Sequence, residues 1–142
     1  MARGKKAEKS KKTRFRGSMN YKQFLVEAKT KQINNFVNFT KDYLGLDDLP
    51  KIIIITDPQF SIDNKTFGCF DLMNDIIKVQ TANRHPLDVC RTLAHELAHY
   101  HQKKSGMEMC GETGSEIENS ANAIAGEIMR HYTKTIKNHG YE

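Results

Sequence analysis

The stretch RHPLDVCRTLAHELAHYHQKKSG, residues 84–106, carries the signals that decide the fold. Pro86 occupies a position favoured for the first residue of a helix. Gly106 follows two lysines and a serine, an arrangement typical of a helix end. Together these signals predict a single helix of about twenty residues between Pro86 and Gly106.

A stripe of polar residues runs along this predicted helix. Its members recur at spacings of four, three, four and three residues: Asp88, Thr92, His95, His99 and Gln102. Most other positions are apolar, so the helix is expected to be largely buried. Polar groups without partners are costly in a protein core, and the stripe therefore needs an explanation. A buried metal site supplies one.

Three residues of the helix, His95, Glu96 and His99, follow the order H-E-x-x-H. His99 lies one helical turn after His95 and within about 40° of it around the axis, so both imidazoles can reach one ion. Zinc bound by two histidines and a carboxylate keeps a fourth position for water, as catalytic sites require. Glu96 points partly away from the ion and can take a proton from the metal-bound water. The spacing therefore predicts a zinc-dependent peptidase with Glu96 as its catalytic residue.

The third metal ligand is expected on a second helix, which begins near Ser115. Glu118 lies beside the apolar face of that helix, a place that suits a ligand facing the core. The alternative is structural, because Ser115-x-x-Glu118 is also a capping box in which the glutamate bonds back to the first amides. Three nearby glutamates compete for the ligand position: Glu108, Glu112 and Glu116.

Two segments resemble known zinc peptidases. TLAHELAHYHQ, residues 92–102, resembles the active-site helix of SprT-like and other minimal zincin metallopeptidases, which share an H-E-L-x-H core. SEIENSANAIAGEIM, residues 115–129, is similar instead to the ImmA/IrrE-like peptidases, in which a glutamate of an E-x-x-A-N run completes the metal site. SprT-like families use a downstream histidine, and this chain has none between His101 and His131.

The missing histidine favours the gluzincin type, with Glu118 as the third ligand. The resemblance also implies a small antiparallel sheet packed on helices, and an edge strand that binds extended substrate. Small proteins of this kind are often phage-encoded, which is an expectation about origin only.

The segments before residue 84 agree with such an α+β fold. Residues 21–45 repeat apolar side chains near a helical period and predict one amphipathic helix or a pair. KIIIIT, residues 51–56, is a β-branched run that predicts a buried strand. Residues 66–71 and 75–80 are strand-like on either side of a turn and predict a hairpin. We expect a zincin-like sheet packed on an N-terminal helix, the H-E-x-x-H helix and a C-terminal helix.

Charge divides the chain into a tail and a domain. Residues 1–18 contain eight basic residues and one acidic residue, a net charge of +7, whereas the other residues contain 14 basic and 16 acidic residues. A block of like charge with little to bury is expected to be disordered. The sequence predicts a basic tail over residues 1–18 and a metallopeptidase domain over residues 19–142.

The tail leaves a second class of function open. Its charge would attract DNA or RNA independently of sequence, and the alternatives are a solubilising arm or a contact for any acidic partner. The whole chain is then alternatively a nucleic-acid-associated or regulatory protein with an inactive zincin domain. The expected partners are a peptide or protein substrate and, through the tail, nucleic acid, but no membrane. Without an apolar segment after the basic N-terminus, the chain reads as cytoplasmic.

Other polar residues have weaker assignments. His101 lies about 200° around the helix from His99 and cannot share its metal. Gln102 and Asp88 are candidates for orienting the ligands from outside the metal site, or alternatively the solvated ends of the polar stripe. His131 and Tyr132 are candidates for stabilising an oxyanion, although no spacing selects either.

Overall fold

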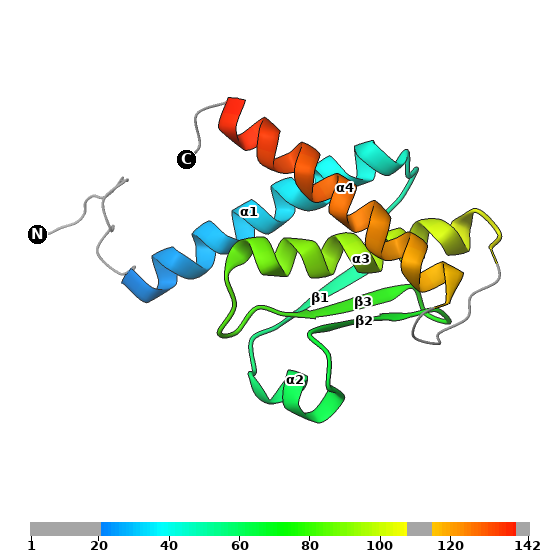
Figure 1. The fold of residues 1–142 in the computed structure, drawn as a ribbon. Coiled ribbons are helices and arrows are strands. Elements are labelled where there is room, and N and C mark those ends of the chain that lie inside the picture. Colours follow the sequence, from blue (N-terminus) through cyan, green and yellow to red (C-terminus); the bar gives the residue numbers. More distant parts are fainter. Residues whose placement is uncertain (1–20, 108–114, 139–142) are drawn as a thin grey trace, which may run out of the picture.

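The chain of 142 residues is described by a computed structural model, which places the backbone of residues 21–107 and 115–138 and the side chains of residues 30–107 and 115–136. Within these ranges four helices and three strands follow one another (Figure 1). In chain order they are α1 (Tyr21–Leu44), β1 (Lys51–Ile55), α2 (Gln59–Asn64), β2 (Gly68–Asp71), β3 (Ile76–Gln80), α3 (Pro86–Lys104) and α4 (Glu116–Asn138). The expected α+β class is confirmed.

The three strands form one sheet in the order β1-β3-β2. β2 and β3 form the predicted antiparallel hairpin, with Phe70 opposite Ile77. β1 instead pairs with β3 in parallel, with Ile54 opposite Val79. The sheet is therefore mixed, and the expectation of antiparallel pairing throughout is corrected for β1. The prediction that β1 is buried is also corrected, because β1 lies at one edge of the sheet and none of its residues is fully buried. An apolar run predicts a strand but neither its place in the sheet nor the direction of its neighbour.

Helices cover one face of the sheet. α3 lies across β2 and β3, and α1 and α4 both pack against α3 on the side away from the sheet (Figure 1). The short helix α2 lies on the opposite side of the sheet from α3 (Figure 1). α3 is consequently the central element, enclosed by strands on one side and helices on the other. Its buried apolar side chains belong to the core and include Val89, Cys90, Leu93, Ala94 and Leu97.

The N-terminal segment forms one helix, α1, rather than a pair. Its apolar residues Ile33, Phe36 and Val37 are buried, and the Phe36 ring meets Tyr132 of α4 edge to face at 4.8 Å between centroids. Gly45 follows with a φ of +70°, a conformation that glycine adopts without steric cost. No helix in the described ranges has the length and apolar character that crossing a bilayer requires.

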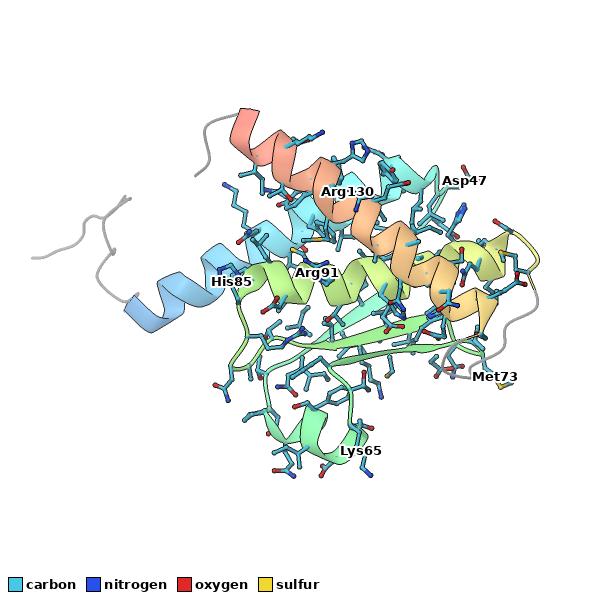
Figure 2. All side chains as sticks on the ribbon, viewed as in Figure 1. Asp47, Lys65, Met73, His85, Arg91 and Arg130 are labelled. Atoms are coloured by element: carbon cyan, nitrogen blue, oxygen red, sulfur yellow. The ribbon has the colours of Figure 1, made fainter. Side chains whose placement is uncertain are left out.

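Both ends of α3 are fixed. At its start the His85 side chain caps the helix, because Nδ1 accepts a hydrogen bond of 3.0 Å from the Leu87 amide. At its far end Lys103 Nζ donates to Asp75 Oδ1 at 2.6 Å, which ties the helix to the turn of the β2–β3 hairpin. Figure 2 shows these two places, with His85 where α3 begins and Met73 at the tip of the hairpin. The helix is thereby held in a fixed register over the sheet.

Candidate metal centre

The histidines of α3 and a glutamate of α4 converge on one point. The Nε2 atoms of His95 and His99 are 3.1 Å apart. Glu118 reaches His95 Nε2 with Oε1 at 3.2 Å and His99 Nε2 with Oε2 at 3.0 Å. Among the described residues, these three form the group whose ligand atoms could hold a metal ion.

The separations of these atoms fit a small tetrahedral cation. Zinc bonds of about 2.0–2.1 Å place two ligand atoms about 3.3 Å apart when the geometry is tetrahedral. The two Nε2 atoms are 3.1 Å apart, close to that value, and each nitrogen lies 3.0–3.2 Å from a different oxygen of the Glu118 carboxylate. Two imidazole nitrogens and one carboxylate also form a donor set that zinc binds readily, with a fourth position available. The residues present therefore fit the metal that the sequence pattern predicts.

Glu118 takes part in both arrangements that the sequence allowed, the helix cap and the metal group. Its backbone amide donates to Ser115 Oγ at 3.2 Å, so the serine caps α4 as a capping box requires. Its carboxylate, however, faces the two histidines of α3. The cap and the metal group coexist because the cap uses the glutamate backbone and the metal group uses its side chain. The competitor Glu116 is exposed at the start of α4, and Glu108 and Glu112 lie outside the described residues.

Gln102 orients His99, as its position in the polar stripe suggested. Gln102 Oε1 lies 2.9 Å from His99 Nδ1, and its Nε2 donates to the backbone oxygen of Ile117 at 3.1 Å. The side chain is 1% exposed. Because Gln102 Oε1 accepts a hydrogen bond from Nδ1, the proton lies on Nδ1, and the unprotonated Nε2 of His99 faces the metal group. Metal-binding histidines commonly have such a hydrogen bond at their other ring nitrogen. Asp88 is exposed at the far end of the stripe and makes no such contact with its side chain among the described residues.

His95 has its own neighbour on α4. The Asn122 side chain lies near the His95 ring. Burial lowers the pKa of His95, the neighbouring His99 lowers it further, and Glu118 and the asparagine act to raise it. A lowered pKa favours the neutral imidazole, which is the form that binds metal. Asn122 was not singled out from the sequence, although its place one turn after Glu118 in the E-x-x-A-N run was a usable signal.

Glu96 lies in the same helix but outside the group of three. It is 8% exposed, and burial followed by the charge of Glu118 raises its pKa to about 7 from an ordinary value of 4.5. A buried carboxyl group with a pKa near neutrality can both accept and return a proton. Such a shift marks a group suited to acid–base chemistry.

The edge strand β2 passes very close to α3 beside Glu96. A Cβ atom added to Gly68 would lie 2.5 Å from Thr92 Cγ2 and 3.7 Å from Glu96 Cγ. Thr92 is in turn held by Arg84, whose Nη2 donates to Thr92 Oγ1 at 2.9 Å. The absence of a side chain at Gly68 thus allows the helix to bring Glu96 against the sheet edge.

The structure separates several other polar residues from this centre. His131 and Tyr132 lie thirteen and fourteen residues after Glu118 on the same helix, which is about 20 Å along its axis. Tyr132 is buried against Phe36, so neither residue can stabilise an oxyanion here. His101 lies instead beside Asp48 in a separate surface hollow, as its angle around α3 indicated.

The comparison with protein-family models finds a related family. The family model described as Peptidase_M78, IrrE N-terminal-like domain, matches residues 32–138, three quarters of the chain. The matched region includes the whole metal group and both helices that form it. Searches of curated proteins and of solved structures found no match.

Proposed function

Because the chain belongs to the peptidase family of IrrE N-terminal-like domains, we propose that it is a zinc-dependent metallopeptidase that hydrolyses peptide bonds. In this proposal His95, His99 and Glu118 are the metal ligands and Glu96 is the catalytic residue. Family membership supports a metallopeptidase in general. The finer assignment depends on the site, because one fold can serve several functions.

A single observation carries the assignment. Donor atoms of three residues on two helices converge: the histidine Nε2 atoms are 3.1 Å apart, and each lies 3.0–3.2 Å from a different oxygen of Glu118. This donor set matches a zinc site with one open position. When both Nε2 atoms are unprotonated, their lone pairs face each other and the carboxylate, an arrangement that a bound cation would stabilise. Gln102 further supports the role, since it orients His99 from outside the group.

The residues around the metal position have separable tasks in this mechanism. A bound zinc ion supplies a Lewis acid that polarises a peptide carbonyl and acidifies a water molecule. Glu96 takes the proton from the attacking water and then delivers it to the leaving amide nitrogen, which its pKa of about 7 allows in both directions. Gln102 keeps His99 in the tautomer that leaves Nε2 free. The edge of β2 at Gly68, beside Glu96, is the side from which an extended substrate would approach.

The metal assignment is tested by elemental analysis of purified protein. Wild type is compared with His95→Ala, Glu118→Ala and Glu116→Ala, the last a control for a glutamate exposed on the same helix. We expect near-stoichiometric zinc in wild type and Glu116→Ala, and loss of it in the other two variants. Zinc retained by Glu118→Ala would remove this residue from the ligand set.

The catalytic assignment needs a separate measurement. Wild type and Glu96→Gln, both loaded with zinc, are incubated with a library of internally quenched peptides. We expect cleavage by wild type only, with equal zinc content in the two proteins. Equal cleavage rates would contradict the role of Glu96. Zinc binding by a wild type that cleaves no peptide would instead favour the regulatory alternative.

The basic tail supports a second proposal, that residues 1–18 bind nucleic acid. Their net charge of +7 is the observation behind it, and they lie outside the described residues. Full-length protein and a variant without residues 1–18 are compared in binding to random-sequence DNA and RNA. We expect a salt-sensitive affinity that is lost with the tail while zinc content is unchanged. Equal binding by both proteins would contradict the proposal.

A further inference from the structure

The strand β1 has an open edge. It lies at one side of the sheet, and within the described ranges no strand pairs with its outer side. The Lys51 amide donates to Asp75 and the Ile55 oxygen accepts from Thr81, both at 3.0 Å. Alternation along a strand then directs the backbone groups of Ile52 and Ile54 away from the sheet. These groups are available to another strand.

Natural proteins usually protect such an edge, and among the described residues β1 has little protection beyond its short length and its first residue, Lys51. Common devices are a central lysine, a proline, a bulge or a covering element. Here the only charge in KIIII is at its first residue, Lys51, and the centre consists of isoleucines. Ile54 lies on the helix-covered face of the sheet, in register with the buried Val79, yet it is 39% exposed. An apolar open edge of this kind is suited to pairing with another chain.

A groove runs beside this edge, between β1 and α1. Its volume is about 400 Å³, and none of its lining residues carries a charge. They are Thr30, Ile33, Asn34, Val37, Asn38, Leu49, Pro50, Ile52 and Ile54. A strand added to β1 would place every second side chain in this groove, under α1. Its occupant is therefore expected to present apolar side chains at alternate positions.

We propose that the occupant is β1 of a second copy of this chain, paired antiparallel about Ile54. In this register Ile54 pairs with its own counterpart, and Ile52 pairs with Thr56. Ile52 and Ile54 are the residues whose backbone groups face outward, and Thr56 directly follows the end of β1, so the pairing extends the strand by one residue. The interface has twofold symmetry, the commonest form in soluble oligomers. Both Ile54 side chains enter the shared groove.

Charge selects this register and this partner. Pairing about Ile54 places Lys51 of each copy opposite Asp57 of the other, so two opposite-charge pairs form across the strands. Both residues are exposed. Asp57 lies two residues beyond the end of β1, and its Oδ1 accepts from the Gln59 amide at 2.9 Å while its charge remains at the surface to meet Lys51. The basic residues 1–18 are a less suitable occupant, because their charge finds no acidic group in the groove.

Such a dimer leaves the metal centre accessible. The sheet would run continuously through both copies, with the two β1 strands in the middle and a β2 strand at each outer edge. Gly68 and the adjacent Glu96 belong to the β2 side. The dimer is thus independent of the proposed peptidase activity, and either can fail without the other.

Charge reversal tests the pairing. The association of full-length protein is measured by sedimentation equilibrium for wild type, Lys51→Asp, Asp57→Lys and the double variant. We expect a dimer in wild type, at least tenfold weaker association in each single variant, and recovery in the double variant, where opposite charges face each other again. Lys65→Asp, an exposed reversal at the end of α2, is the control and should dimerise as wild type does. Wild type that is monomeric throughout, or single variants that associate normally, would overturn the proposal.

A crosslink tests the register directly. Residues in a hydrogen-bonded antiparallel pair have Cα atoms about 5.5 Å apart, a distance that a disulfide spans. Ile54→Cys should therefore form a covalent dimer under mild oxidation, well above the background of the native cysteines. Ile62→Cys, at a more exposed isoleucine on α2, should not exceed that background. A chain without residues 1–18 that dimerises where full-length protein stays monomeric would identify the tail as the occupant and contradict the proposal.

Discussion

Gln102 Oε1 lies 2.9 Å from Nδ1 of His99, and through this contact one buried side chain connects the metal centre to the packing of two helices. The same amide donates through Nε2 to the backbone oxygen of Ile117, which immediately precedes Glu118 on α4. Gln102 thus fixes the ring of one proposed ligand and the start of the helix that carries another. The site is positioned by the core rather than by the metal alone.

Replacing Gln102 should weaken both metal binding and folding. Gln102→Leu leaves His99 Nδ1 and the Ile117 oxygen without their partner in a buried position. We expect about 10–100-fold weaker zinc binding and a loss of about 1–3 kcal/mol in the free energy of unfolding. Zinc competition with a chelator and urea unfolding of the metal-free protein measure the two effects. Asp88→Leu, at the exposed end of the same stripe, is the control, and equal effects from both variants would contradict this role of Gln102.

Glu96 should lower the stability of the metal-free protein at neutral and higher pH. Its pKa is raised from 4.5 to about 7 in the folded state, so the folded protein binds a proton more tightly than the unfolded chain does. Stability contributed by the protonated group is complete below pH 4.5 and is lost as the pH rises through about 7.

Glu96→Gln removes this titration. The difference in free energy of unfolding, variant minus wild type, should increase by up to about 3 kcal/mol from pH 4 to pH 8. Each unit of pKa shift corresponds to about 1.4 kcal/mol. The measurement is urea unfolding at both pH values with a chelator present. Glu116→Gln, at an exposed glutamate, should show no such gain. A pH-independent difference between Glu96→Gln and wild type would contradict the shifted pKa.

A buried hydroxyl in α1 should be dispensable. Thr40 is 0% exposed, and its Oγ1 finds no hydrogen-bond partner among the described residues. An unsatisfied buried hydroxyl costs about 1–3 kcal/mol on mutational scales, so Thr40→Val should raise the free energy of unfolding by about 1 kcal/mol. Thermal unfolding measures this, with zinc content as a check that the site is intact. A clear loss of stability in Thr40→Val would mean that the hydroxyl has a partner in solution.

Much of the fold was predictable because its signals are local. Pro86 and Gly106 mark where α3 begins and ends, and the two runs around the turn at Asn74 gave the hairpin. The short helix α2 was missed, since six residues are too few for a helical period to be visible. The parallel direction of β1 was also missed, because it depends on how the chain returns to the sheet rather than on the residues of the strand.

The site shows the same division between local and long-range information. His95, Glu96 and His99 share one helix, and their spacing alone brings them to one side of it. Glu118 was ambiguous from sequence because a cap requires only its own helix, whereas a ligand requires α4 to pack at one particular height on α3. The structure brings the two together through contacts such as that of Gln102 with Ile117. Gly68 was not identified at all, because its importance comes from a helix that approaches from elsewhere in the sequence.

The approach of α3 to the sheet edge gives the last prediction. A Cβ atom at Gly68 would lie 2.5 Å from Thr92 Cγ2 and 3.2 Å from the Lys78 backbone oxygen. Contacts this short force β2 and α3 apart, so Gly68→Ala should lower the free energy of unfolding by about 1–3 kcal/mol, as overpacking commonly does. Because Glu96 lies one turn beyond Thr92, we also expect reduced peptide cleavage at unchanged zinc content.

A second change should relieve the clash. Thr92→Ser removes Cγ2 but keeps the hydroxyl that accepts from Arg84, so Gly68→Ala combined with Thr92→Ser should recover much of the stability and cleavage lost in Gly68→Ala. Thr92→Ser alone controls for the missing methyl group and should cost about 1 kcal/mol. Urea unfolding and peptide cleavage of the four proteins measure the coupling between the two positions. If the two changes are merely additive, the helix and the strand are not in the tight contact described, and the position of Glu96 against the sheet edge must have another cause.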